Sequence, residues 1–198
     1  NERLLTWVYD QPALLHRIME VIRDDRKAHF RFMEKEQLLY VNTDTWMPCP
    51  GSYGFVSDLP QPGYNGGARL KDCWCWTDSQ ESEPISPEMY GEFFLPYIAE
   101  VTRSFGLTYY GCCERLDDRF PYIEKAIPNL RAVSVSGWSN PFGMAEMLGK
   151  RYVFSRKPTP AFISGAHPNW DLLKKDMADT AAAARDCNLE ICFRDIYT

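Results

Sequence analysis

The amino-acid sequence predicts an α/β fold of the (β/α)8 barrel type, with the N-terminal strands of the barrel missing. Strand-like and helix-like segments alternate five times between residues 73 and 193, which indicates parallel strands covered by helices. Polar residues directly follow the strands, where α/β proteins hold their active sites. The chain has 198 residues, whereas a closed barrel typically needs about 250. We therefore expect residues 1–198 to form a single domain, the C-terminal part of such a barrel.

The first 70 residues predict one long helix and one long irregular segment. Apolar residues recur at three- and four-residue steps over residues 12–38, a spacing typical of an amphipathic helix. Residues 39–41 are a short strand candidate. Nine prolines and glycines between residues 43 and 70 predict an irregular segment. Loops longer than about 15 residues are usually functional or disordered.

From residue 73 the predicted elements are regular. Ser86 and Asn140 each precede a proline, the arrangement of a helix N-cap followed by proline at the first helical position. Pro96 should kink its helix or remove one backbone hydrogen bond. The rival architecture is an open flavodoxin-like sheet, which would need a glycine-rich phosphate loop that the sequence lacks. The predicted strands are residues 73–76, 108–113, 132–136, 152–155 and 189–193.

Composition and charge exclude several classes of protein. A hydrophobic content of 45% excludes a disordered tail. No stretch of 18 apolar residues exists, so no membrane span is expected. A net charge of −5 without clustered Lys or Arg argues against nucleic-acid binding. Seven cysteines and no visible signal peptide predict a reduced, cytoplasmic protein.

The first candidate site is the run Tyr110-Gly111-Cys112-Cys113-Glu114 at the end of a predicted strand. A thiolate at a strand end can bind a soft metal or act as a nucleophile. Adjacent residues of a strand point to opposite faces, so only one of the two cysteines enters a site unless the strand ends there. The alternative is that a small buried cysteine packs as a hydrophobic residue.

The second candidate site is Asp78-Ser79-Gln80-Glu81, which follows the strand at residues 73–76. Two carboxylates at this position can act as acid, base or substrate anchor if burial shifts one pKa. The alternative is that Asp78 or Ser79 caps a local turn.

The third candidate site is a set of charged residues after the last two strands. Cations at a barrel rim suit carboxylate or phosphate substrates, and solvated rim charges are the alternative. The three histidines have no Ser or Cys partner nearby in the sequence, so no catalytic triad is predicted. The set comprises Arg156, Lys157, Arg194 and Asp195, within the runs Ser155-Arg156-Lys157-Pro158 and Arg194-Asp195.

Three motifs together resemble the uroporphyrinogen decarboxylase superfamily, which includes zinc-dependent methyltransferases that move methyl groups between corrinoid proteins and thiols. The similarity extends from about residue 70 to residue 198. It implies a (β/α)8 barrel. The motifs are Ser79-Gln80-Glu81, the run Ile85-Ser86-Pro87-Glu88-Met89-Tyr90 with Glu92-Phe93-Phe94-Leu95-Pro96-Tyr97, and Tyr110-Gly111-Cys112-Cys113-Glu114.

The methyltransferase branch of this superfamily carries a zinc-binding His-x-Cys motif and a third cysteine near the last strand. Here Tyr110 stands at the His position, Cys112 matches the Cys, and Cys192 lies in the last strand. Cys113 and Glu114 can substitute as ligands, because thiolates and carboxylates both bind zinc. The resemblance thus implies zinc held by Cys112, Cys113 and Cys192, and a corrinoid carried by a partner protein.

These features lead to three hypotheses. The first is a metal-assisted methyltransferase acting with a corrinoid or thiol methyl carrier. The second is a decarboxylase-like lyase acting on a tetrapyrrole or another polycarboxylate, and the third is a binding protein that kept the fold and lost catalysis. Open strand edges further predict a homo-oligomer or an edge hidden beneath residues 48–67. The expected catalytic residues are Asp78, Glu81 and Glu114, and the expected substrate-binding residues are Ser79, Gln80, Tyr110, Arg156, Lys157, Arg194 and Asp195.

Overall fold

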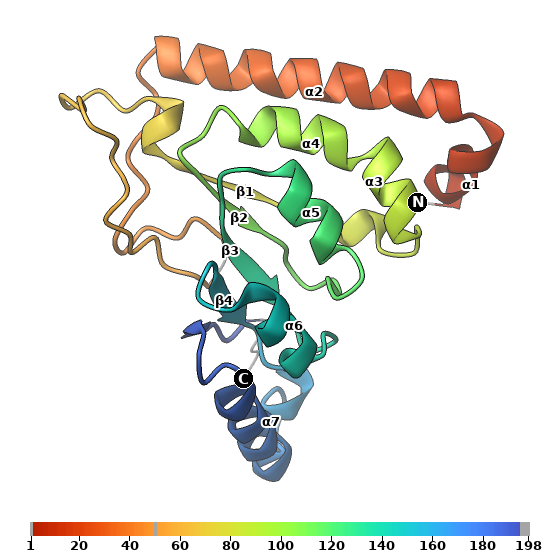
Figure 1. Cartoon of the computed structure of the whole chain (residues 1–198), viewed down its shortest axis with the longest axis vertical. Helices are drawn as coiled ribbons and strands as arrows, with labels where there is room; N and C mark the ends of the chain where they lie inside the picture. The colour runs from red at the N-terminus through yellow and green to blue at the C-terminus, as the bar shows by residue number, and fades with distance from the viewer. Residues whose placement is uncertain (1, 50, 195–198) are drawn as a thin grey trace.

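A five-stranded parallel sheet forms the centre of the computed structural model, which describes residues 2–49 and 51–194 (Figure 1). The strands are adjacent in the order in which they occur along the chain, and every neighbouring pair is parallel. All five strands that the sequence predicts from residue 73 onward are confirmed. They are β1 (Trp74–Thr77), β2 (Leu107–Tyr110), β3 (Leu130–Val135), β4 (Val153–Arg156) and β5 (Asn188–Ile191).

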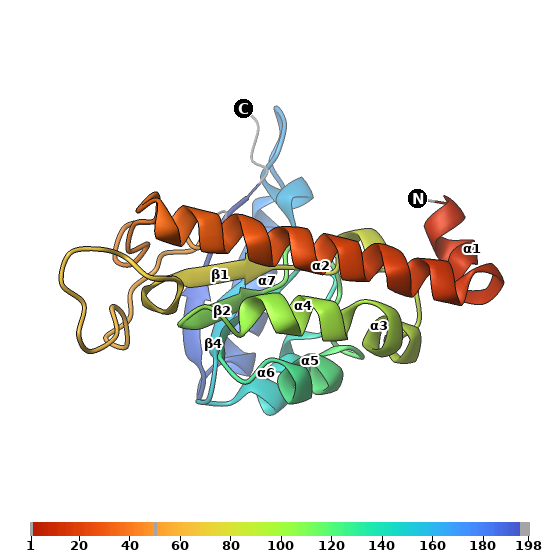
Figure 2. The same ribbon diagram turned by 90° about the horizontal axis from the view of Figure 1, so that it is seen from above.

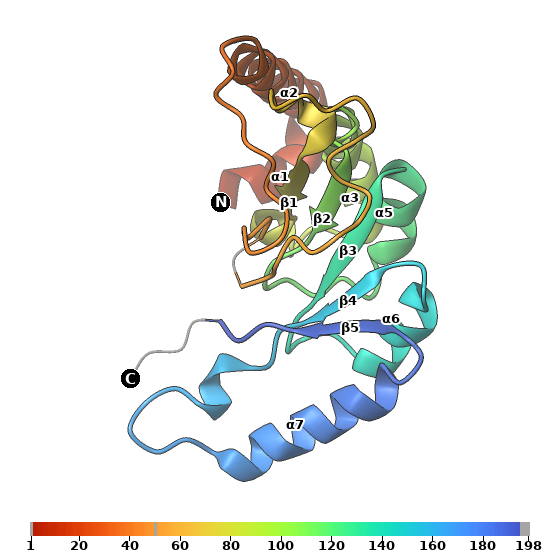
Figure 3. The same ribbon diagram turned by 90° about the vertical axis from the view of Figure 1, so that its left-hand side faces the viewer.

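Helices cover one face of the sheet. Figure 3 shows α3, α5 and α6 on one side and the irregular segment that precedes β1 on the other. When each right-handed crossover leads to the next strand in the same direction across the sheet, all the connecting helices lie on one face. In a doubly wound sheet the strand order reverses, and helices cover both faces. The described strands form an open sheet with β1 and β5 at its edges. The helices are α3 (Pro87–Phe93), α4 (Leu95–Thr102), α5 (Phe120–Ala126), α6 (Pro141–Leu148) and α7 (Trp170–Ala183).

The predicted helix caps are present. The Ser86 side chain accepts a hydrogen bond from the backbone N–H of Met89 at 3.3 Å. The Asn140 side chain accepts from the N–H of Phe142 at 3.0 Å and from that of Gly143 at 3.3 Å. Pro96 lies in the first turn of α4, where the chain breaks between α3 and α4 as the sequence predicts. These caps fix where the helices begin relative to the strands.

The N-terminal region differs from the prediction. The helix expected over residues 12–38 is confirmed as α2 (Pro12–Lys35), which ends three residues earlier, and a helix that was not expected, α1 (Glu2–Asp10), precedes it. Figure 2 shows α2 running alongside α4 and the β1 edge. The strand predicted at residues 39–41 is wrong. The Asn42 side chain instead accepts from the N–H of Trp74 at 2.7 Å and donates to its carbonyl at 3.1 Å, so an amide group pairs with the β1 edge in place of a strand.

Replacing Asn42 by alanine removes both of these hydrogen bonds at the β1 edge. We expect Asn42→Ala to lower the free energy of unfolding by about 1–2 kcal/mol, because the backbone groups of Trp74 lose their partners. Urea denaturation measures the change. Asn65→Ala is the control, since the Asn65 side chain only accepts from the nearby Gly67 N–H at 3.4 Å. Equal stability of the two variants would contradict a role for Asn42 at this edge.

The irregular segment, residues 43–69, lies over the face of the sheet that the helices leave open. Its described residues, 43–49 and 51–69, contain no helix or strand, only an isolated bridge between Asp44 and Gly54. Its residues Cys49 and Leu59 are buried with strand residues of β1 to β3. We call this side of the sheet the loop face and the other side the helix face. The loop face carries Trp74, Leu107, Tyr109 and Ala132, and the helix face carries Tyr110, Val133, Val135 and Phe154.

The largest hydrophobic core lies between the helix face and its helices, and contains residues of α3 to α6. None of the described helices is long and apolar enough to cross a membrane. All seven cysteines carry free thiols.

Candidate functional site

A buried lysine lies at the carboxyl end of β4 on the loop face. Lys157 is 4% exposed. Its Nζ donates to the Tyr109 hydroxyl at 2.9 Å and to the Ser134 hydroxyl at 2.8 Å, and lies 3.6 Å from the Cys49 sulfur. The Tyr109 hydroxyl in turn donates to Ser155 Oγ at 2.6 Å. These side chains come from three strands and from the irregular segment, so the fold assembles a group that no short sequence motif contains.

Strand alternation explains why these residues meet. Successive side chains of a strand point to opposite faces. Ser134 lies between two valines of the helix-face core, and Ser155 and Lys157 flank Arg156. Sequence reasoning included Ser155 in the third candidate site but missed Cys49, Tyr109 and Ser134. Serines at alternate positions of two neighbouring apolar strands were the signal that could have identified a polar patch on one face.

Three further cysteines lie near this group. Arg194 Nη1 donates to Cys112 Sγ at 2.9 Å, and the sulfurs of Cys112 and Cys113 are 3.7 Å apart. Cys192 Sγ lies 3.7 Å from Ser155 Oγ. We name the whole group the strand-end site: Cys49, Asp78, Tyr109, Cys112, Cys113, Ser134, Ser155, Lys157, Cys192 and Arg194.

Burial dominates the acidity of two of these thiols. It raises the pKa of Cys192 to about 11, with the charge of Glu190 adding to the effect and that of Lys157 opposing it. Burial also raises the pKa of Cys49, while Lys157 and Arg194 lower it. Both thiols are therefore protonated at neutral pH, and Lys157 is a cation that acts on both of them.

The turn after β2 brings Cys112 to the loop face. Gly111 has a φ of +101°, and a Cβ there would lie 2.8 Å from Leu116 Cδ1 and 2.9 Å from Ser134 Cβ. Only glycine fits this conformation and this space. The strand therefore ends before the two cysteines, and the alternation that would separate them no longer applies.

Asp78 follows β1 and has the strongly shifted acidity expected of an acid or base. Its pKa is raised to about 6, by burial first and then by the charges of Glu114 and Glu81. Lys157 lowers it, so the lysine charge reaches this carboxyl group. A carboxyl group with this pKa exchanges a proton near neutral pH.

The raised pKa of Asp78 predicts a pH-dependent stability. The folded pKa of about 6 exceeds the usual value of 3.8, so the folded protein holds this proton more tightly, and ionisation costs stability as the pH rises between these values. The Asp78→Asn variant lacks this ionisable group, so its free energy of unfolding should increase relative to that of the wild type as the pH rises. We expect this difference to be about 1 kcal/mol larger at about pH 7.5 than at about pH 4.5, after allowance for solvent screening. Urea denaturation at the two pH values measures this. A difference that is equal at both, or larger in acid, would contradict the shift.

Glu114, an expected catalytic residue, instead joins two strand-end loops. Its side chain is 1% exposed. One carboxylate oxygen accepts from the Ser79 N–H at 2.8 Å and from the Ser79 hydroxyl at 3.1 Å, and the other accepts from the Cys112 N–H at 2.8 Å. Both carboxylate oxygens of Glu114 thus accept hydrogen bonds from within the protein. This geometry makes Glu114 and Ser79 positioning residues for Asp78 and Cys112.

Two expected substrate-binding residues lie on the helix face, away from Lys157. Arg156 pairs with Asp176 of α7 and donates to the carbonyls of Val135 and Ser136. The Tyr110 hydroxyl pairs with the Tyr90 hydroxyl of α3 inside the core. Adjacent strand positions point to opposite faces, so the sheet separates both side chains from the strand-end site.

The remaining residues expected in the site lie on a turn after β1, outside the described residues, or in the strand-end site. Gln80 and Glu81 are exposed on a short 3-10 turn after β1, where the Glu81 charge acts on Asp78. Asp195 lies outside the described residues. Cys112, Cys113, Lys157, Cys192 and Arg194 belong to the strand-end site.

The donor set for zinc is incomplete. The 3.7 Å between the sulfurs of Cys112 and Cys113 is close to the roughly 3.8 Å between thiolates that share a tetrahedral zinc ion with bonds of about 2.3 Å. Within the described residues, however, no three His, Cys, Asp or Glu side chains form a group that could hold a metal. Cys112, Cys113 and Cys192 do not converge, so we derive no step through a metal.

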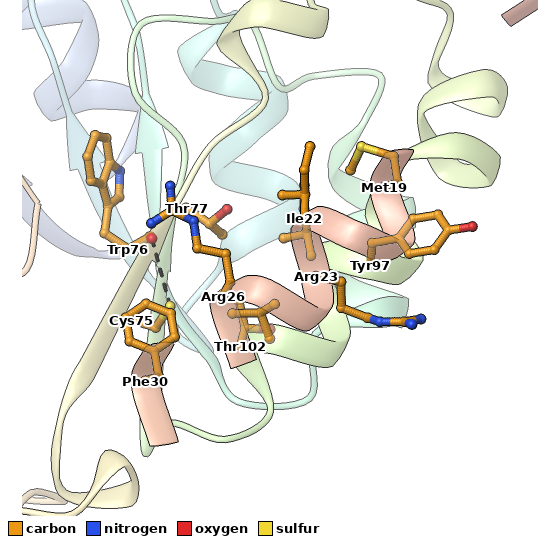
Figure 4. A pocket seen from close by; sticks show the side chains of 12 residues that line it. Met19, Ile22, Arg23, Arg26, Phe30, Cys75, Trp76, Thr77, Tyr97 and Thr102 are labelled. Carbon is orange, nitrogen blue, oxygen red and sulfur yellow. Dashed lines mark hydrogen bonds between the residues drawn. The ribbon is translucent and has the colours of Figure 1, made fainter. Parts of the chain in front are cut away.

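One cavity, of about 380 Å³, lies between α2, β1 and α4 and contains none of the expected site residues; Figure 4 shows Met19 and Arg26 of α2 with Cys75 and Thr77 of β1 around it. A smaller pocket of about 40 Å³ is lined by Lys157 and Arg194, with Cys113 and Trp138. The smaller one opens on the strand-end site.

Comparison with known proteins identifies no relative: no family model, no curated protein and no solved structure matches the chain. The superfamily resemblance therefore stays a prediction from the sequence, and the functional argument depends on the site.

Proposed function

We propose that this chain is a barrel-type enzyme similar to the uroporphyrinogen decarboxylase superfamily, and that it transfers a methyl group from a corrinoid or thiol carrier to a sulfur acceptor. The observation that supports it best is the strand-end site, where four cysteines lie with Lys157 and Arg194 at the carboxyl ends of parallel strands. Strand order and one-sided helix cover also agree with part of a barrel.

In this proposal the protein supplies a positive charge through Arg194 and a proton acceptor through Asp78. Arg194, which already donates to the Cys112 sulfur, binds the acceptor as an anion, since guanidinium groups bind anions through charge-assisted hydrogen bonds. Asp78 takes the proton that the acceptor thiol releases, because its pKa is about 6. The new sulfur–carbon bond then forms as the carrier loses its methyl group. Zinc bound with Cys112 and Cys113 as two of its ligands would supply further acidification of the thiol.

A methyl-transfer assay tests the proposal. The protein is incubated with methylcobalamin and 3-mercaptopropionate, and loss of the methylated cobalamin is followed by absorbance. We expect Cys112→Ser to lower the rate at least about tenfold, as for loss of a group that acts on the reacting thiol. Cys187→Ser is the matched control, since Cys187 lies after α7 and contacts Ala145. A wild-type rate equal to the rate without protein would reject the transferase.

Zinc content tests the metal part separately. Protein produced in zinc-supplemented medium should contain about one zinc per chain if Cys112 and Cys113 take part in binding it, and Cys112→Ser should lose it. Less than about 0.2 zinc per chain would reject zinc while leaving the methyl-transfer result to stand on its own.

The second candidate function is a decarboxylase-like lyase acting on a tetrapyrrole or another polycarboxylate. Asp78, with its pKa near 6 and its coupling to Lys157, favours it, because an acid beside a cation suits carboxylate chemistry without a thiol. Titration with a porphyrin polycarboxylate separates the two functions. Tight binding that Lys157→Met weakens would support the lyase, and absence of binding would reject it.

Self-association belongs to the same proposal. β5 is an edge strand, and its Leu189 and Ile191 are 38% and 43% exposed. Unpaired edges with apolar residues promote association between chains. We expect light scattering to give a mass above that of a monomer, increasing with concentration. A strictly monomeric mass would reject this part.

A further inference from the structure

Lys157 is a buried amine whose hydrogen bonds all go to neutral groups. Its Nζ contacts the hydroxyls of Tyr109 and Ser134 and the sulfur of Cys49. Among the described residues, no carboxylate oxygen forms a salt bridge with it, whereas the exposed Lys174 and Lys175 both pair with aspartates. Because no carboxylate of the described residues forms an ion pair with this amine, loss of its proton would leave none of these buried carboxylates without its counter-ion. A lysine acts as a nucleophile only after it has lost that proton.

The same lysine lines the small pocket together with the cationic side chain of Arg194. Ser136 and Trp138 also line it. Arg194 has five N–H donors, and the hydrogen bonds of the described residues use one of them, on Cys112. The lining of this pocket therefore offers a short ligand both an amine and a guanidinium group that can bind a carboxylate.

We propose that Lys157 forms an imine with short oxo acids, whose carbonyl carbon is attacked by Nζ while Arg194 binds their carboxylate. The uncharged amine forms the nitrogen–carbon bond and loses its two N–H hydrogens. The carbonyl oxygen leaves with them as water, so atoms balance and no oxidant is needed. The Tyr109 hydroxyl, 2.9 Å from Nζ and donating to Ser155, is placed to pass these protons.

This inference extends the proposed function by naming a substrate class, an acid that carries a carbonyl group. It depends on that proposal only in taking the strand-end site as the substrate site. Imine formation at Lys157 requires neither the thiols nor a metal, so its test is independent of the methyl-transfer and zinc tests.

Reductive trapping tests it on the wild-type protein. The folded protein is incubated with glyoxylate and sodium cyanoborohydride, which reduces an imine to a stable secondary amine, and peptide mass spectrometry follows labelling at each of the eight lysines. We expect Lys157 to be labelled at least about tenfold faster than Lys174, although the Lys174 side chain is 79% exposed. Acetaldehyde, which lacks the carboxylate, should show no such preference for Lys157.

Arg194→Gln is the matched variant. It should slow labelling of Lys157 by glyoxylate and leave labelling by acetaldehyde unchanged, a pattern that a merely misfolded site would not give. Labelling of Lys157 no faster than that of Lys174 in the wild-type protein would overturn the inference. Equal labelling of Lys157 by glyoxylate and acetaldehyde would overturn the role of Arg194. Labelling of Lys157 in a protein without methyl transfer would support the imine site and reject the transferase.

Discussion

Replacing Arg119 by methionine is expected to lower the free energy of unfolding by about 4 kcal/mol, because several buried carbonyl groups would lose their hydrogen-bond donor. Arg119 precedes α5 and is 3% exposed. Its guanidinium group donates to the carbonyls of Ser79, Ser82, Glu83 and Ile85, all in the segment between β1 and α3.

The Arg119 guanidinium also lies 4.5 Å from the centre of the Tyr90 ring, so it contacts an aromatic face of α3 as well. Urea denaturation of Arg119→Met measures the loss. Arg115→Met is the control, since Arg115 is half exposed and pairs with the exposed Asp118. A change below about 1 kcal/mol for Arg119→Met would contradict this account of the segment after β1.

Glu114→Ala is the second variant with a large expected effect. We expect a loss of about 3 kcal/mol, because the buried N–H groups of Ser79 and Cys112 would both be left without acceptors. Glu92→Ala is the control, since Glu92 is exposed on α3. Glu114→Gln keeps one acceptor oxygen, so it should recover part of the stability that the alanine variant loses.

The position of Cys112 gives a second readout for Glu114. If the carboxylate positions this cysteine, the alkylation rate of Cys112 should change in Glu114→Ala and return toward the wild-type rate in Glu114→Gln. An unchanged alkylation rate together with an unchanged unfolding curve would contradict the positioning role.

The regular part of the fold could be predicted from the sequence because its signals are local. The strands are short apolar runs that end in charged residues, and Ser86 and Asn140 mark helix starts through their own hydrogen bonds. The strand expected at residues 39–41 is wrong because a tertiary contact decides that position. The Asn42 amide, not a backbone ladder, meets Trp74.

The candidate site could be predicted only in part, for the same reason. Lys157 and Arg194 were expected because charged residues follow strands. Arg156 has the same sequence signal as Lys157, but it points to the helix face, where it meets Asp176. Cys49 joins Lys157 across 108 positions of sequence, and nothing in the irregular segment indicates which face of the sheet it covers.

In the proposed function, the strand-end site binds an anionic substrate through Arg194. Calorimetric titration of the wild-type protein with 3-mercaptopropionate tests this binding most directly, beside Arg194→Gln and the control Arg185→Gln, whose arginine is exposed after α7. We predict that Arg194→Gln raises the dissociation constant at least about tenfold, equivalent to about 1.4 kcal/mol, and that Arg185→Gln leaves it unchanged. Equal affinity of Arg194→Gln and wild type, or no binding to the wild-type protein, would contradict this proposal.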